Sequence, residues 1–250
     1  MSILKFNGKI LKNNGNVLIN RPGSYFYTFA NIAERLLDMT FEKCAIFVRH
    51  SVRLSTQWGP EVHLTDLGIS YAMQAGMVLM DIPDEFDYYS TDMVRTKETA
   101  MYISKGREDG KVETTGDVLP MNNMPNPEYI KDQTRYNEYS QQYGYNNLWR
   151  KYMYREQDFS DAFYDITDVS QAFETAVLTN ITKKYNIIVS HDQNVMPFMA
   201  DRGVVRSPGS IPDFRPNKWL NYLTGTVMIK FAGSDTPRYL PITGLGTGFN

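Results

Sequence analysis

Three short segments place histidine, arginine and carboxylate side chains directly after apolar runs. They are Arg49-His50-Ser51-Val52-Arg53, Ser90-Thr91-Asp92-Met93-Val94-Arg95-Thr96 and Ser190-His191-Asp192. Each preceding run is of the kind expected of a buried parallel strand. Because ligands bind at the carboxyl ends of parallel strands in an α/β sheet, we expect the three segments to meet there.

Together these side chains suit an oxyanion better than a cation. Two histidines and three arginines would repel a metal ion, and Asp192 is the one carboxylate expected beside them as a further ligand. Guanidinium groups offer paired planar donors that match phosphate, and helices that begin at the same place add backbone N–H groups. We therefore expect a bound phosphate group, with no metal and no cofactor.

Short apolar runs predict the strands that carry these segments. The runs are 45–48, 86–89, 186–189, 227–231 and 239–242. Two further short strands are expected within 3–20, around the turn signal Asn13-Asn14-Gly15. Since helical patterns lie between the runs, we predict an α/β fold, with a mostly parallel sheet flanked by helices.

Apolar residues at helical spacing predict the intervening helices. One helix is expected after Ser24, and another over about 65–80 with an apolar face of Leu67, Tyr71, Ala75, Val78 and Leu79. A third would run to about residue 104. Thr91 and Asp92, at its start, are expected mainly to cap it.

Residues 105–182 interrupt the alternation of strands and helices. They contain the proline-rich stretch 120–127 and then eight of the chain's 17 tyrosines, between 129 and 164. We predict a core formed by 1–104 and 183–250, with a smaller, mainly helical cap inserted over 105–182. Three arginines of this cap are candidates for substrate contact, although surface charge is the simpler interpretation: Arg135, Arg150 and Arg155.

The three segments, taken together and in this order, resemble the signatures of the histidine phosphatase superfamily. The matching patterns are Arg49-His50-x-x-Arg53, Ser90-Thr91-Asp92-x-x-Arg95-Thr96 and His191-Asp192. Leu64-Thr65-x-x-Gly68 resembles a further motif of the acid phosphatase and phytase branch, branch 2. The His191-Asp192 pair also favours that branch over the phosphoglycerate mutase branch. The resemblance covers about 42–104 and 185–232 and implies a phosphoglycerate mutase-like core.

The resemblance implies a phosphomonoester hydrolase of the acid phosphatase type, working without a metal. His50 would be the nucleophile that carries the phosphoryl group, and Asp192 would protonate the leaving group. Arg49, Arg53, Arg95 and His191 would bind the phosphoryl oxygens. Ser51 stands where the family usually has glycine, and we expect its side chain close to the bound phosphate.

Two other functions fit the same residues. One is a phosphomutase or phosphotransferase on this fold, which would return the phosphoryl group to substrate. The other is a weakly active protein that binds phosphorylated ligands, suggested by Ser51. We expect the substrate choice to depend on the cap and on residues 203–216.

The overall charge limits the classes of partner that we expect the protein to bind. A net charge of −2, from 26 basic and 28 acidic residues, gives no broad attraction to nucleic acid or membrane. The expected partner is a phosphorylated small molecule, and a phosphate or sulfate ion would fit the same site. The single cysteine, Cys44, precludes an internal disulfide. As given, the sequence favours the cytoplasm; a removed signal peptide would make the protein periplasmic or secreted. The oligomeric state is not predicted.

Overall fold

The computed structural model describes residues 27–54, 56–202 and 219–244, together with the backbone of six two-residue strands near the N-terminus. These are β1 (Ser2–Ile3), β2 (Lys5–Phe6), β3 (Lys9–Ile10), β4 (Lys12–Asn13), β5 (Asn16–Val17) and β6 (Ile19–Asn20). They pair antiparallel as β1–β6, β2–β3 and β4–β5. The β4–β5 pair flanks the predicted turn, whose central residues lie outside the described ones, as does Ser24.

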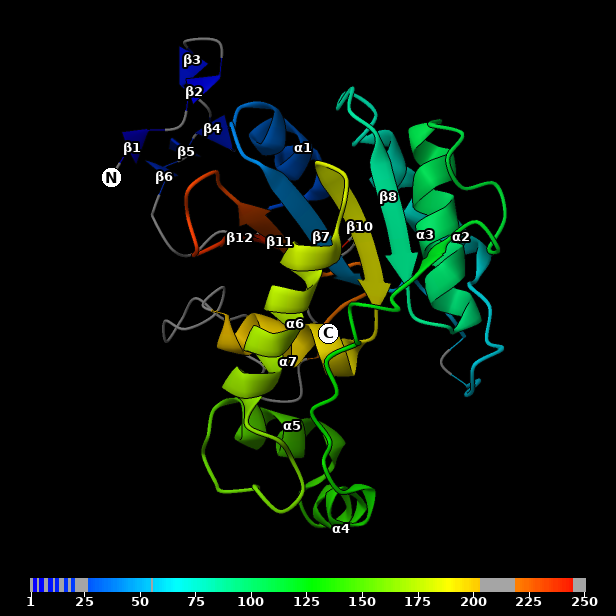
Figure 1. The fold of residues 1–250 in the computed structure, drawn as a ribbon, viewed down its shortest axis with the longest axis vertical. Coiled ribbons are helices and arrows are strands. Elements are labelled where there is room, and N and C mark those ends of the chain that lie inside the picture. The colour runs from blue at the N-terminus through cyan, green and yellow to red at the C-terminus, as the bar shows by residue number, and fades with distance from the viewer. Residues whose placement is uncertain are drawn as a thin grey trace.

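A six-stranded sheet lies at the centre of the fold, in the order β12-β11-β7-β10-β8-β9 (Figure 1). Its strands are β7 (Lys43–Arg49), β8 (Phe86–Ser90), β9 (Leu119–Pro120), β10 (Tyr185–Ser190), β11 (Gly225–Lys230) and β12 (Arg238–Ile242). Strands β7, β10, β8 and β9 are parallel, whereas β11 is antiparallel to both of its neighbours. The predicted mostly parallel α/β sheet is confirmed.

The described part of the chain forms seven helices. They are α1 (Phe29–Leu37), α2 (Asp66–Met77), α3 (Val94–Arg107), α4 (Gln133–Tyr143), α5 (Tyr145–Met153), α6 (Ile166–Asn180) and α7 (Asp192–Asp201). The side chain of Thr28 caps α1 by accepting from the backbone N–H of Asn31. Among the described residues, none of the helices is long and apolar enough to cross a membrane.

Alternate residues of β7 face two separate hydrophobic cores, as the two-residue period of a strand requires. Ile46 and Val48 point into the core shared with α1, α2 and α3. Phe47 points into the other core, where its ring centroid lies 4.7 Å from that of Phe173 on α6 and 5.6 Å from that of Phe198 on α7. With both faces covered, β7 is buried from its second residue onward, and β8 and β10 are buried over their whole length.

Part of the segment expected to form the inserted cap, 105–182, either joins the sheet or packs on it. Helices α4 and α5 lie away from the sheet (Figure 1). Helix α6 instead packs on the sheet through Phe173, and β9 adds a parallel strand beside β8. Within 105–182, the chain thus departs from the sheet only between β9 and α6. The division into core and cap stays a proposal.

Helices α2 and α3 pack backbone against backbone. A Cβ atom on Gly76 would lie 2.0 Å from the carbonyl oxygen of Ile103, and one on Gly106 would lie 2.1 Å from that of Met73. The buried face of α2 therefore consists of small residues, namely Gly68, Ala72, Ala75 and Gly76. The expected apolar face was wrong at Leu67, which is 51% exposed, because a close helix pair excludes large side chains.

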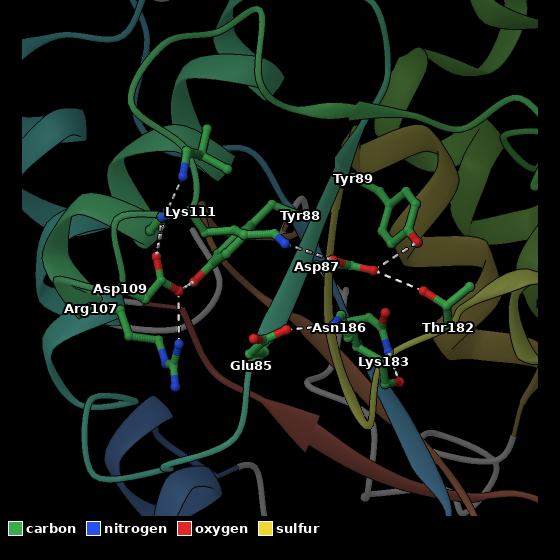
Figure 2. A network of polar contacts seen from close by, with 12 residues as sticks. Glu85, Asp87, Tyr88, Tyr89, Arg107, Asp109, Lys111, Thr182, Lys183 and Asn186 are labelled. Carbon is green, nitrogen blue, oxygen red and sulfur yellow. Dashed lines mark hydrogen bonds and ion pairs between the residues drawn. The ribbon is translucent and has the colours of Figure 1, made fainter.

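A polar network fixes the N-terminal ends of β8 and β10, opposite the ends that carry the predicted site (Figure 2). Asp109 accepts hydrogen bonds from Tyr88, from Ser104 at 2.5 Å and from Arg107 at 2.7 Å. Arg107 also donates to three backbone carbonyls between α2 and β8, those of Leu79, Ile82 and Asp84. Nearby, Asp87 accepts from Thr182 at 3.0 Å. These bonds satisfy buried polar groups and tie α3 to β8.

Candidate active site

The three predicted segments meet at the C-terminal ends of β7, β8 and β10. In the parallel register Ser190 lies opposite Arg49, and Val189 lies opposite Ser90. The backbone N–H of His50 donates to Ser190 O at 2.9 Å, so the chain leaves both strands at one level. Figure 1 shows the arrowheads of the three strands at the same end of the sheet.

Hydrogen bonds at both ring nitrogens of His50 fix its imidazole in one tautomer. Its Nδ1 lies 2.7 Å from the carbonyl oxygen of Ser51, which can only accept, so Nδ1 carries the hydrogen. Its Nε2 accepts from Nε of Arg95 at 3.3 Å, and a guanidinium nitrogen can only donate. Both contacts leave the lone pair on Nε2, the nitrogen that faces the arginine.

The same surroundings keep His50 uncharged. The side chain is buried, with the residue 3% exposed. Burial lowers the pKa of His50 well below its ordinary value of 6.5, and the positive charge of Arg49 and the neighbouring His191 lower it further. A neutral imidazole with a free Nε2 lone pair is the form that can act as a nucleophile.

A chain of hydroxyl groups fixes the second histidine. The Thr96 hydroxyl donates its one hydrogen to a backbone carbonyl, with Met93 O at 2.7 Å and Thr91 O at 2.9 Å. The Thr91 hydroxyl, 2.9 Å from Thr96 Oγ1, must then donate to it. Nε2 of His191, 2.9 Å from Thr91 Oγ1, therefore donates to Thr91. His191 is held in the opposite tautomer to His50.

The other nitrogen of His191, Nδ1, is buried without a hydrogen-bond partner among the described residues. Burial, followed by the charge of Arg95, lowers the pKa of His191 to about 4. The ring is therefore neutral at neutral pH, with its lone pair on Nδ1. To donate from Nδ1 to a phosphate oxygen, the ring must first take up a proton, which a bound dianion favours.

Three arginines concentrate positive charge around the two histidines. Arg53 donates from Nη1 to the carbonyl oxygens of Leu54 at 2.8 Å and Gln57 at 2.6 Å. Arg95 donates from Nη1 to Gly59 O at 2.8 Å. Burial, and then the positive charge of Arg53, lower the pKa of Arg95. A bound oxyanion would relieve this repulsion.

The third guanidinium, that of Arg49, lies 4.2 Å above the ring of Tyr222 and also donates to Leu220 O. Nε of Arg49 and Nε of Arg53 are buried without a hydrogen-bond partner in the part of the chain that the structure describes. Phosphate oxygens would satisfy such donors. Across the same residues, no three His, Cys, Asp or Glu side chains are grouped as metal ligands would be.

Asp192 lies at the start of α7 and pairs with Arg49, with Oδ2 3.0 Å from Nη2. The same oxygen accepts from Nε1 of Trp219 at 2.7 Å, and Oδ1 accepts from the backbone N–H of Gln193 at 2.9 Å. Burial alone would raise the pKa of Asp192, but Arg49 and Trp219 outweigh it and hold the pKa below its ordinary value of 3.8. Without a ligand, Asp192 is a carboxylate and not yet a proton donor.

The side chain of Ser51 makes a structural contact, and its expected contact with phosphate stays a prediction. Its side chain is fully buried, and its hydroxyl donates to Gly68 O at 2.7 Å, in the first turn of α2. Its backbone N–H donates to Thr99 Oγ1 at 3.0 Å. The serine at this position thus joins the end of β7 to α2 and α3, and the structure does not direct its hydroxyl toward a substrate.

The structure does not bring the three cap arginines into the site. Arg135, Arg150 and Arg155 are each held by a partner within 105–182, the segment expected to form the cap. These partners are, respectively, Asp161, Glu156 and Thr167. Substrate contact by these arginines stays a prediction. Residues 203–216, expected to bear on substrate choice, lie outside the described residues.

The hydrogen bond between Thr91 and His191 was not predicted from the sequence, nor were the aromatic residues beside Asp192. Helix α3 begins after Met93 without a side-chain cap, so the expected capping by Thr91 and Asp92 was wrong. Asp92 is exposed and pairs with Lys97 at 3.3 Å. The position of Thr91 in its motif, directly after a strand, could have indicated a role in the site. Trp219 and Tyr222 belong to no motif that we recognised.

A family model described as the histidine phosphatase superfamily (branch 1) matches residues 46–199. The chain belongs to this superfamily. The match is to branch 1, so the expected assignment to branch 2, the acid phosphatase and phytase branch, is not supported. The His191-Asp192 pair therefore did not identify the branch.

Solved structures share the fold at low sequence identity. The mycobacterial glucosyl-3-phosphoglycerate phosphatase gives a TM-score of 0.50 at 14% identity, covering 80% of this chain and 96% of that chain. A protein named mycobacterial hydrolase 1 gives 0.51 at 14% identity, covering 82% and 100%. Curated protein sequences gave no match. The comparisons confirm the phosphoglycerate mutase-like α/β fold of this superfamily.

Proposed function

We propose that the protein hydrolyses small phosphomonoesters through a phosphohistidine formed on His50. One observation carries this proposal: the ring of His50 is neutral, and both of its hydrogen bonds leave the lone pair on Nε2, beside Arg95. Membership of the histidine phosphatase superfamily supports phosphatase or phosphomutase chemistry in general. The charges around this nitrogen favour a phosphate group as its reaction partner.

In the first step, Nε2 of His50 attacks phosphorus in line with the ester oxygen. The N–P bond forms while the P–O bond to the leaving group breaks. Arg49, Arg53 and Arg95 exchange their present acceptors for the non-bridging oxygens, and so stabilise the charge that builds up in the transition state. Nε of Arg95 must release Nε2 for this attack, and an oxygen of the substrate replaces it as acceptor.

Asp192 supplies the proton that the leaving oxygen needs. When a phosphate dianion draws the charge of Arg49 to itself, the carboxylate loses its strongest partner and its pKa rises, which favours proton uptake. The protonated acid then gives this proton to the leaving alkoxide. In the second step the regenerated carboxylate takes a proton from water. The water oxygen bonds to phosphorus, the N–P bond breaks, and Nε2 recovers its lone pair.

The test is to trap the intermediate. The protein is mixed with a ³²P-labelled phosphomonoester and quenched in alkali, in which phosphohistidine survives. We expect label on the wild type, and both label and turnover lost by about 1,000-fold or more in His50→Gln. His63→Gln is the matched control, because His63 is exposed and pairs with Glu98 at 2.6 Å; it should keep both. Near-native turnover by His50→Gln would contradict the proposal.

A product assay separates hydrolysis from transfer. Hydrolysis releases inorganic phosphate in a fixed ratio to the freed alcohol, whatever other alcohols are present. A phosphomutase or phosphotransferase would instead pass most of the label from His50 to an acceptor hydroxyl. We expect the first result.

A further inference from the structure

The carboxylate of Asp192 has an aromatic wall beside it, and the following inference rests on the proposed function of this carboxylate as the acid. Trp219 donates from Nε1 to Oδ2 of Asp192 at 2.7 Å. The ring centroids of Trp219 and Tyr145 are 4.9 Å apart, with the planes inclined by 47°. Tyr145 is the first residue of α5, and its hydroxyl accepts from Gln193 at 2.8 Å. A cap helix and the segment before β11 thus place two rings next to the acid.

The rings of this aromatic wall, defined as Tyr145 and Trp219, remain partly accessible. Tyr145 is 38% exposed, and Trp219 is half-buried. A third ring, that of Tyr222, lies 5.7 Å from the ring of His50, centroid to centroid. Aromatic surface therefore borders both the nucleophile and the acid, and part of it is free to contact a ligand.

A further indole lies on the side of Arg53. Trp58 is 82% exposed, the largest exposure among the large apolar side chains that the structure describes. Its ring centroid lies 4.9 Å from the guanidinium carbon of Arg53. The backbone on either side of it is held by the site, because Gln57 O and Gly59 O accept from Arg53 and Arg95. An exposed tryptophan tied to a phosphate-binding arginine offers a second aromatic face to a ligand.

The geometry of the reaction directs the leaving group to the wall. The leaving oxygen must lie opposite Nε2 of His50 and within hydrogen-bond reach of Asp192. Oδ2 of Asp192 contacts Arg49 and Trp219, and Arg49 is taken up by the phosphoryl group. The group attached to the leaving oxygen therefore emerges beside Trp219 and its neighbour Tyr145.

We propose that the preferred substrates are phosphomonoesters whose leaving group carries an aromatic ring, and that this ring packs on the wall of Tyr145 and Trp219. Aromatic rings gain from offset or edge-to-face contact beyond the area that they bury. A saturated ring of the same size lacks that gain. The wall is thus a specificity determinant, separate from the arginines that bind the phosphoryl group.

The test compares two phosphonates that cannot be hydrolysed, 2-phenylethylphosphonate and 2-cyclohexylethylphosphonate, by titration calorimetry. They share the anionic group and differ in the aromaticity of the ring. We expect the wild type to bind the phenyl compound about 2- to 10-fold more tightly. Tyr145→Phe should keep this preference, and Tyr145→Leu should reduce it, because the ring of Trp219 is then the one left in the wall. Tyr164→Leu is the control, because Tyr164 is an exposed cap tyrosine outside the wall.

Equal affinity of the wild type for the two phosphonates, including no measurable binding of either, would overturn the inference. So would a preference that is as large in Tyr145→Leu as in the wild type. Turnover of benzyl phosphate and cyclohexylmethyl phosphate, measured in parallel, separates this result from the proposed function. If neither ester is hydrolysed while the phenyl phosphonate binds better, hydrolysis is wrong and the aromatic preference stands. If both esters are hydrolysed and the phosphonates bind equally, only the aromatic preference fails.

Discussion

His191 should make the protein less stable in acid, by an amount that follows from its surroundings. Its pKa is about 4 in the folded protein, mainly because of burial and then Arg95, against an ordinary value of 6.5. Between these values the unfolded chain binds a proton that the folded protein does not. The free energy of unfolding therefore falls as the pH drops from 6.5 toward 4. At about 1.4 kcal/mol per pH unit, the full loss is about 3 kcal/mol.

The experiment compares urea unfolding of the wild type and of His191→Gln at pH 7 and at pH 4.5. Contributions from other groups are largely common to both proteins and cancel in the difference. We expect the wild type to lose about 2.5 kcal/mol more than the variant between the two pH values. His63→Gln is the control with the opposite sign. A hydrogen bond and charge from Glu98 raise the pKa of His63, so its stabilisation is present in acid and lost as the pH rises.

Parallel pH dependence in the wild type and His191→Gln would refute this reasoning. Ring ¹⁵N spectra give an independent check, since the chain has three histidines and each can be assigned by substitution. His50 and His191 should appear neutral near pH 6, protonated on Nδ1 and Nε2 respectively. A charged His191 at that pH would contradict the lowering of its pKa by burial and by Arg95.

Two further substitutions probe the supports of the site. Thr91→Val leaves the Nε2–H of His191 without its acceptor, which should cost about 1–3 kcal/mol of stability and about 10-fold or more in kcat/KM. Thr91→Ser should restore both, and an unimpaired Thr91→Val would contradict the assigned hydrogen-bond chain. Gly106→Ala places a methyl group against Met73 O and should destabilise by about 1–3 kcal/mol or more in urea unfolding. Gly116→Ala, whose Cβ would have its nearest neighbour at 3.5 Å, should change stability by about 0.5 kcal/mol or less.

The strands and the residues at their ends were predictable because local sequence determines them. A run such as that of β7 is apolar on both faces, and its abrupt change to Arg49-His50 marks the end of the strand. Once three strands of this kind are placed in parallel, Arg95 and His191 must approach His50. The phosphate-binding chemistry follows from residue types alone, since guanidinium groups keep their charge wherever they lie.

Contacts between distant segments were not predictable in the same way. Leu67 was expected to be buried because helical periodicity does not reveal how closely a neighbouring helix approaches; the glycines of α2 and α3 decide that. Thr91 was expected to cap a helix because its partner, His191, lies 100 positions away. The ionised state of Asp192 depends on Trp219, which no motif linked to it.

The loop that follows β7 has a consequence for how the reaction cycle ends. Leu54 O, Gln57 O and Gly59 O hold two guanidinium groups when no phosphate is bound. The backbone thus competes internally with every incoming anion. When inorganic phosphate departs, Nη1 of Arg53 and Nη1 of Arg95 return to these carbonyls, which lowers the cost of product release. Such a loop trades affinity for a quicker return to the free enzyme.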